Sequence, residues 1–216
     1  MTARPIIMGV DLSGPSNHAD TACVVFERLG DTLIYRRHLA WLGDADLLHL
    51  VEGASRGASL TIGLDAPLSY QDGGGDRSRD RELRKRLTRV GMPSGTVMTP
   101  TMTRMAYLTL RGVSLSRMIA TSHPEAAIVE VHPFGSLALA GAPVEDLAIV
   151  KKDASARERI AAWLSDNGMD GLPDQEFSDH ELAAFGAAWA AWKWQSGDAA
   201  WMAPVEHPSH PFAFAC

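Results

Sequence analysis

Acidic residues occur where apolar, strand-like segments of this sequence end. Asp11 follows the apolar run 6–10, Asp65 follows the run 60–64, and Glu130 lies inside the run 126–131. A carboxylate at a buried strand end costs free energy unless it is protonated, paired with a basic side chain or bridged by a cation. If these strand ends meet at one edge of a sheet, the pattern predicts Asp11, Asp65 and Glu130 as catalytic residues.

A fourth acid opens the last apolar segment, in the run Ser178-Asp179-His180-Glu181. Ser178 and Glu181 also form a capping-box pattern, which alone would explain the acids there. Carboxylate oxygens are hard ligands that suit Mg²⁺ or Mn²⁺, and such ions activate water and stabilise a leaving oxygen in phosphodiester cleavage. We therefore expect Asp11, Asp65 and Asp179 to be catalytic metal ligands, and Glu130 to bind metal or orient water.

Basic residues gather in the segment 77–89, where seven lysines and arginines face two acids. Leu83 and Leu87 are four residues apart, which predicts a helix with one apolar stripe. A solvated helix face would account for these charges. The alternative is that guanidinium groups bind substrate phosphates, whose geometry they match. The candidate substrate-binding residues are Ser13, Arg79, Arg81, His132 and Lys151.

Composition indicates an ordinary globular protein. The chain has 216 residues, 46% of them hydrophobic, and a net charge of −6. This charge argues against a dedicated high-affinity nucleic-acid binder, although a local basic patch stays compatible with nucleic acid as a partner. We expect one domain over residues 1–216 with an irregular C-terminal tail from about residue 197. No signal peptide or membrane-spanning run is visible, so we expect a cytoplasmic protein with no membrane partner. The oligomeric state stays open.

The order of the predicted elements indicates an α/β fold. Strands are expected at 6–10, 22–26, 33–39, 60–64 and 126–131, and helices at 44–57, 77–89, 102–120, 134–140, 154–167 and 179–194. Short connections join the first three strands, which predicts an antiparallel meander, whereas intervening helices predict that the later strands add in parallel. The result is a mixed five-stranded sheet with helices on both faces. Ligands bind such sheets beyond the carboxyl ends of parallel strands.

Five short motifs occur in a fixed order along the chain. They are Gly9-Val-Asp-Leu-Ser-Gly14, Ile62-Gly-Leu-Asp-Ala-Pro-Leu-Ser69, Arg79-Asp-Arg-Glu-Leu-Arg84, Glu130-Val-His-Pro-Phe134 and Ser178-Asp-His-Glu-Leu-Ala183. Together they resemble the family called domain of unknown function 429, described as predicted nucleases of ribonuclease H-like fold. The resemblance covers residues 6–195. It implies a ribonuclease H-like fold and metal-binding or catalytic acids at Asp11, Asp65, Glu130 and Asp179.

One position departs from the family pattern. Members often carry a second Asp one helical turn after the first on the last helix, where this chain has Ala183. Glu181 is a poor substitute, because residues two apart on a helix point in different directions. The change puts one metal site, or catalysis itself, in question.

These observations predict a divalent-metal-dependent nuclease or phosphodiester hydrolase that acts on nucleic acid or a nucleotide-like substrate, with Mg²⁺ or Mn²⁺ as cofactor. One alternative is a catalytically weak or inactive module of the same fold that binds nucleic acid or nucleotides, which Ala183 and the negative net charge allow. A second is a single-lobe protein that binds nucleotide phosphates. The run Gly9–Gly14 also resembles the phosphate loop of sugar kinase and actin-type ATPases, although those proteins need two lobes.

Overall fold

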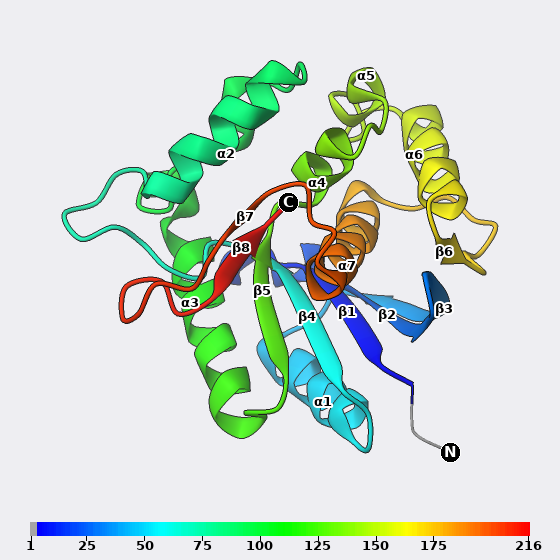
Figure 1. Ribbon diagram of the computed structural model, residues 1–216, viewed down its shortest axis with the longest axis horizontal. Coiled ribbons are helices and arrows are strands. Elements are labelled where there is room, and N and C mark those ends of the chain that lie inside the picture. Colours follow the sequence, from blue (N-terminus) through cyan, green and yellow to red (C-terminus); the bar gives the residue numbers. More distant parts are fainter. Residues whose placement is uncertain (1–3) are drawn as a thin grey trace.

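A computed structural model describes residues 4–216, which form a mixed eight-stranded sheet in the order β6-β3-β2-β1-β4-β5-β8-β7 (Figure 1). The strands are β1 (Ile6–Asp11), β2 (Ala22–Leu29), β3 (Thr32–Ala40), β4 (Leu60–Asp65), β5 (Ala127–Val131), β6 (Met169–Asp170), β7 (Met202–Ala203) and β8 (Ala213–Ala215). β1, β2 and β3 form the antiparallel meander, and β4 and β5 continue the sheet in parallel with β1. The predicted mixed α/β sheet is therefore confirmed.

The predicted number of strands was wrong, because the sequence analysis missed β6, β7 and β8. Each has only two or three residues, too few to show an alternating pattern. The segment from residue 197, which we expected to be irregular, thus contributes two strands. β8 pairs in parallel with β5, placing Phe214 opposite Glu130, and β7 pairs with β8. Tertiary pairing, rather than local propensity, makes these strands.

Helices cover both faces of the sheet, as predicted (Figure 1). They are α1 (Asp44–Ser55), α2 (Ser78–Arg89), α3 (Thr103–Ser122), α4 (Pro133–Leu139), α5 (Val144–Leu147), α6 (Ala154–Asp166) and α7 (Asp179–Ser196), with short 3-10 helices η1 (Pro15–Asp20) and η2 (Ser94–Thr96). None of the described helices has the length and apolar character needed to cross a membrane.

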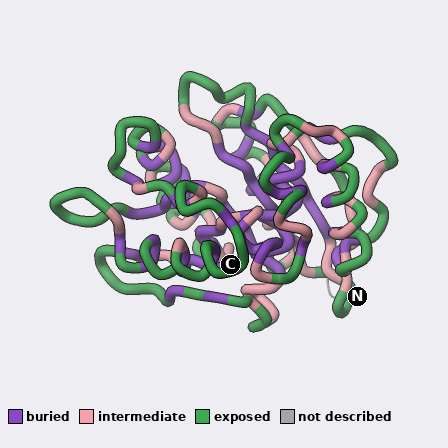
Figure 2. Tube along the Cα trace, turned by 90° about the horizontal axis from the view of Figure 1, so that it is seen from above, coloured by how far each residue is buried: buried purple, intermediate pink, exposed green. Residues whose placement is uncertain are grey.

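Alternate residues of the central strands supply two separate cores. Met8 and Val10 of β1 pack with residues of α1 and α3, whereas Ile7 packs with residues of α4, α6 and α7. This alternation follows from the strand period of two, because successive side chains point to opposite faces of the sheet. Figure 2 shows the resulting buried segments running through the interior of the molecule.

The alanine-rich helix α7 lies unusually close to the sheet. Gly9 and Gly63 are partners in the parallel pairing of β1 with β4. A Cβ atom on Gly9 would lie 2.1 Å from the Ala184 carbonyl oxygen, and one on Gly63 would lie 2.4 Å from that of Ala187. The two glycines therefore let the backbone of α7 approach the strands, two residues before each strand ends on an aspartate.

We predict that Gly63→Ala destabilises the protein by about 1–3 kcal/mol, because the new methyl group meets helix backbone that cannot move aside easily. Urea unfolding measures this loss. Gly53→Ala is the control. Gly53 is exposed within α1 and has no neighbour within 4 Å of an added Cβ, so this change should be neutral or stabilising by up to about 1 kcal/mol. Equal unfolding midpoints for the two variants would contradict the close packing of α7.

Candidate functional site

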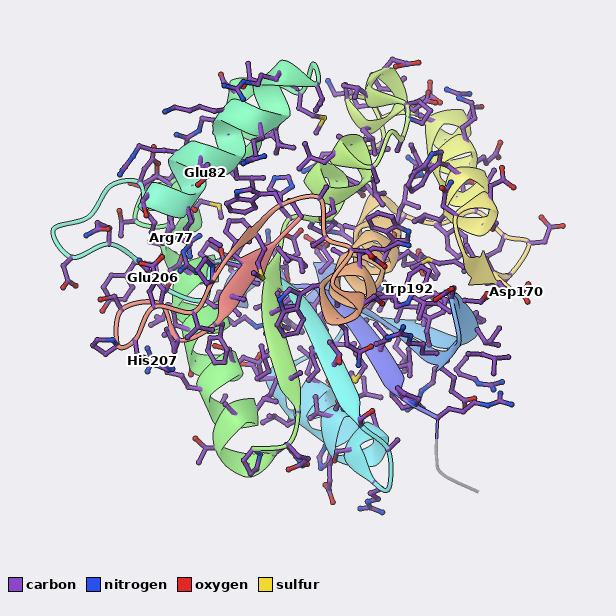
Figure 3. The ribbon with its side chains drawn as sticks, in the orientation of Figure 1. Arg77, Glu82, Asp170, Trp192, Glu206 and His207 are labelled. Atoms are coloured by element: carbon purple, nitrogen blue, oxygen red, sulfur yellow. The ribbon has the colours of Figure 1, made fainter. Side chains whose placement is uncertain are left out.

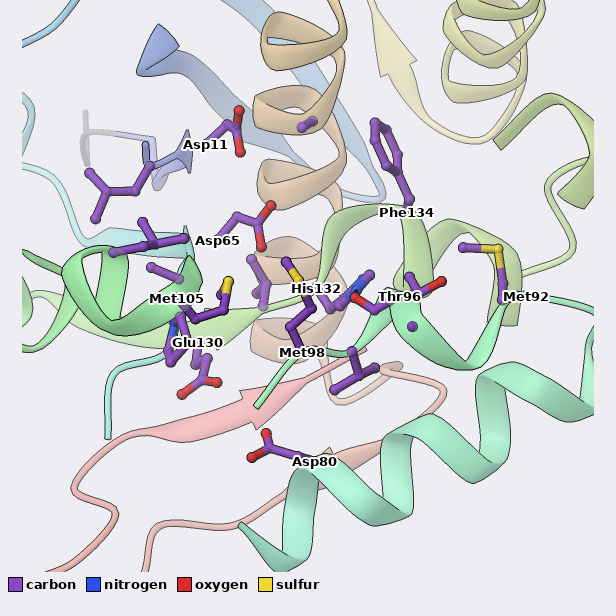
Figure 4. Close-up of a pocket in the computed structure, with 18 of the residues that line it drawn as sticks. Asp11, Asp65, Asp80, Met92, Thr96, Met98, Met105, Glu130, His132 and Phe134 are labelled. Atoms are coloured by element: carbon purple, nitrogen blue, oxygen red, sulfur yellow. Dashed lines mark hydrogen bonds between the residues drawn. The ribbon is translucent and has the colours of Figure 1, made fainter. Parts of the chain in front are cut away.

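Asp11 and Asp65 meet at the carboxyl ends of two neighbouring strands. The parallel pairing of β1 with β4 places them directly opposite one another, at the position that follows the strand interiors. Both line a cavity of about 440 Å³ (Figure 4). Burial raises the pKa of Asp11 and, together with repulsion from Asp11, raises the pKa of Asp65 well above its usual value. Two such carboxylates need a shared proton or a cation between them.

The first turn of α7 brings two more titratable side chains to this pair. The Nδ1 atom of His180 lies 2.6 Å from Oδ2 of Asp11, and this hydrogen bond raises the pKa of the imidazole. Asp179 lines the same cavity. His180 was not among the residues that we predicted for the site, although it lies in the motif that we noted there. A histidine beside a helix cap gives no sign in sequence that it will reach a strand end 169 residues away.

The predicted capping box at α7 is present. The Ser178 side chain accepts a hydrogen bond from the backbone N–H of Glu181, and the Glu181 carboxylate accepts one from that of Ser178. The other Glu181 oxygen lies 3.2 Å from His38. Glu181 is therefore occupied away from the cavity and does not replace the acid that the family pattern expects at Ala183.

Glu130 differs from Asp11 and Asp65, because both of its carboxylate oxygens accept hydrogen bonds from nearby groups of the protein. Arg77 donates from Nη1 to Oε2 over 2.8 Å and from Nη2 to Oε1 over 2.5 Å. The backbone N–H of Leu68 also donates to Oε2, over 3.0 Å. Both carboxylate oxygens thus accept hydrogen bonds from the protein, and Arg77 forms an ion pair with this acid. This arrangement does not fit the metal-binding or water-orienting role that we expected for Glu130.

Arg77 is the centre of a buried ionic cluster. Its guanidinium also donates to Asp80 and to the hydroxyl and carbonyl oxygens of Ser69, and lies over the ring of Phe214. Figure 3 shows Arg77 beside the C-terminal segment. The cluster therefore joins α2, β5, β8 and the segment after β4. In Figure 4, Glu130 and Asp80 lie below Asp65, on the side away from Asp11.

His132 and Lys151 line the cavity, as their predicted roles require. His132 is engaged on both ring nitrogens: Gly135 N–H donates to Nδ1, and Nε2 lies 3.1 Å from the Thr96 carbonyl oxygen. Burial lowers its pKa, and the contact with Thr96 holds the η2 segment over the cavity. Lys151 opposes the effects of burial and of Asp11 on the pKa of Asp65. Among residues 4–216, no carboxylate lies within 4.0 Å of Lys151.

The structure does not bring Ser13, Arg79 and Arg81 to the cavity. The Ser13 hydroxyl donates to the Asn17 carbonyl within the turn after β1. Arg79 is buried and donates to the carbonyl oxygens of Phe212 and Pro204, so it holds the C-terminal segment. Arg81 donates to the Asp76 carbonyl at the start of α2. The phosphate-binding role predicted for Arg79 and Arg81 is therefore not supported, since both side chains donate hydrogen bonds to backbone carbonyl oxygens of the protein.

The described residues contain no ready-made metal centre. No three His, Cys, Asp or Glu side chains between residues 4 and 216 form a group arranged to hold an ion. What the cavity offers is a pair of acids, Asp11 and Asp65, with Asp179 further away. Any metal must therefore bind with few protein ligands.

We predict that Glu130→Gln destabilises the protein by about 3 kcal/mol, because it leaves the buried Arg77 with one partner fewer. Chemical denaturation measures the loss. Arg56→Gln serves as the control, since it removes an exposed ion pair with Glu52 and should cost less than about 1 kcal/mol. A Glu130→Gln variant as stable as the control would show that the cluster does not support the fold.

Comparison with known proteins gives one match. A model of the family described as "Protein of unknown function (DUF429)" matches residues 9–207, which is most of the chain. No curated protein and no solved structure matches. The match covers the strand-end aspartates, the basic helix and α7 alike. The chain therefore belongs to the DUF429 family.

Proposed function

We propose that this protein is a divalent-metal-dependent hydrolase of phosphodiester bonds, with its metal ion held by Asp11 and Asp65. One observation carries the proposal: the buried Asp11 and the half-buried Asp65 lie opposite one another at adjacent strand ends, and their pKa values are raised. A charge arrangement of this kind is unfavourable in a merely structural role and becomes favourable when a cation occupies it.

The donor set fits one Mg²⁺ or Mn²⁺ ion rather than two. Mg²⁺ is commonly held by one or two carboxylates, with waters and substrate phosphate oxygens completing its shell. A second ion would need Glu130, which is bound to Arg77. When bound, a single ion supplies a Lewis acid for the phosphoryl group and lowers the pKa of water.

The chain's own residues have distinct roles in this proposal. His180 holds the Asp11 carboxylate in place through its hydrogen bond. Lys151 is the cation available to a non-bridging phosphate oxygen. Asp179 stays the predicted third ligand because it lines the same cavity from the first turn of α7, but its side chain would have to move to join the two aspartates, since no three such groups among the described residues are arranged to hold an ion.

The sheet supports a ribonuclease H-like assignment. Its central part has the order β3-β2-β1-β4-β5, in which β2 is antiparallel to β1 and β3, and β1, β4 and β5 are parallel. We infer that this is the ribonuclease H-like core, extended at both edges by short strands. Nuclease activity is the form of phosphodiester hydrolysis that the sequence predicts for such a core, with nucleic acid or a nucleotide as substrate.

A second candidate rests on Ala183. This residue lines the cavity one turn after Asp179, where the resemblance leads us to expect an Asp. The side chain that is missing is therefore one that would have faced the acids. This observation favours a weakly active or inactive module that binds nucleotides or nucleic acid at the same cavity.

We predict that Mn²⁺ raises the melting temperature of the wild type in a concentration-dependent way, and that Asp65→Asn abolishes this rise. A ligand that binds only the native state stabilises it by about 2.7 kcal/mol at a concentration of 100 times Kd. Differential scanning fluorimetry provides the measurement. Asp170→Asn, a change of the same kind at an exposed acid of β6, should keep the full response. An identical response of both variants would exclude Asp65 as a ligand.

We further predict that Ala183→Asp tightens Mn²⁺ binding by about tenfold or more, equivalent to about 1.4 kcal/mol, and raises the rate of bis(p-nitrophenyl) phosphate hydrolysis. The new carboxylate would sit one turn from Asp179 on the same helix face. Ala183→Asn has nearly the same size without the charge and should give no gain. The idea of a lost ligand fails if Asp and Asn at this position behave alike. Calorimetry with Mn²⁺ and a chromogenic assay give the two readouts.

A further inference from the structure

The cavity that contains the aspartates is largely apolar elsewhere. Methionines come from the segment after α2 and from the first turn of α3, and an aromatic ring comes from α4. Figure 4 shows these side chains around the same space as Asp11 and Asp65. The apolar lining includes Met92, Met98, Met105, Leu108 and Phe134. A site that contacts only a phosphate backbone does not require an apolar surface of this kind.

We propose that the substrate is a nucleotide-sized phosphodiester whose base lies against Met98, Met105 and Phe134, while its phosphate faces Asp11, Asp65 and Lys151. This inference rests on the proposed function and narrows it, because it replaces an extended nucleic-acid strand by a single nucleotide unit. Methionine suits a flat, polarisable partner, since its thioether contacts aromatic rings favourably. Aromatic side chains stack on nucleobases of any sequence.

The size of the cavity agrees with one such unit. Its volume of about 440 Å³ falls in the range of pockets that bury most of a small ligand. The wall is also held in place. His132 binds the carbonyl of Thr96, and Arg84 donates to the carbonyl of Val97 over 2.8 Å. The η2 segment is thus fixed before a ligand arrives, which reduces the entropy lost on binding.

The distribution of charge also argues against a polymer. A nucleic-acid strand requires a series of free basic side chains along its path. Three arginines of the α2 region are bound to the protein: Arg77 to Glu130, Arg79 to two backbone carbonyls, and Arg84 to Asp76. Lys85 and Arg89 of the same helix are exposed, but they are not among the described residues that line the cavity. Among the described residues that line the cavity, Lys151 is the only lysine or arginine without an ion pair. This single lysine can pair with one phosphate group of a ligand in the cavity.

Binding measurements test the proposal. Calorimetry in the presence of Mn²⁺ would compare the 5′-monophosphates of adenosine, guanosine, cytidine and uridine with inorganic phosphate and with a single-stranded 12-mer oligonucleotide. At least one nucleotide should bind at least about tenfold tighter than inorganic phosphate, a gain that burial of about 60 Å² of apolar surface provides. The same nucleotide should bind tighter than the 12-mer, because Lys151 is the only lysine or arginine without an ion pair among the described residues that line the cavity.

A matched pair of variants tests the apolar wall. Met98 and Met118 are similarly exposed, at 39% and 38%, but only Met98 is among the residues lining the cavity in the described chain. Met98→Gln should weaken nucleotide binding by about threefold or more and leave phosphate binding unchanged, whereas Met118→Gln should change neither. The proposal is overturned if no nucleotide exceeds phosphate, if the 12-mer binds more tightly, or if Met98→Gln has no effect.

The melting response to Mn²⁺ separates this test from that of the proposed function. If Mn²⁺ stabilises the protein through Asp65 but nucleotides bind no better than phosphate, the substrate class is wrong and the metal-dependent function stands. If nucleotides bind through Met98 without any Mn²⁺ response, the nucleotide site stands and the metal-dependent function is wrong.

Discussion

Repulsion between two carboxylates is the constraint around which this molecule is arranged. The parallel register of β1 and β4 fixes Asp11 opposite Asp65, and both side chains line the cavity. The surrounding elements bring positive charge to them. His180 arrives from α7, and Lys151 lies on another wall of the cavity. The close approach of α7 depends in turn on Gly9 and Gly63. These two glycines therefore allow α7 to place His180 beside Asp11.

The neighbouring strand shows a carboxylate that is paired with an arginine inside the protein. Glu130 lies on β5, next to β4, and receives two hydrogen bonds from Arg77 and one from Leu68. It has become part of the protein's internal structure. Asp65 has no comparable basic partner, because Lys151 acts on it only through its charge. The contrast between two acids on adjacent strands is the strongest physical argument that Asp11 and Asp65 are kept for a ligand.

The sequence predicted well what depends on local pattern. The strand runs that end on Asp11 and Asp65, the capping box at Ser178 and the apolar stripe of Leu83 and Leu87 are all present in the structure. The failures concern partners far apart in the chain. The contact of Arg79 with Phe212 spans 133 residues, and that of Arg77 with Glu130 spans 53. Neither contact produces a periodicity or a motif in the sequence. An arginine that donates to a backbone carbonyl therefore cannot be distinguished by sequence from one that binds a phosphate.

The same reasoning explains why the substrate is better inferred from the cavity than from the basic residues. The arginines of the segment 77–89 left a phosphate-binding surface open as an alternative, but Arg79 and Arg84 are used to hold the C-terminal segment and the start of α2. The cavity itself is a small space with acids at one end and methionines along its side. A metal ion would reverse the charge of the acidic end and make it attractive to a phosphate. Affinity for the remainder of the ligand would then come from the apolar wall, which favours a compact nucleotide over a long backbone.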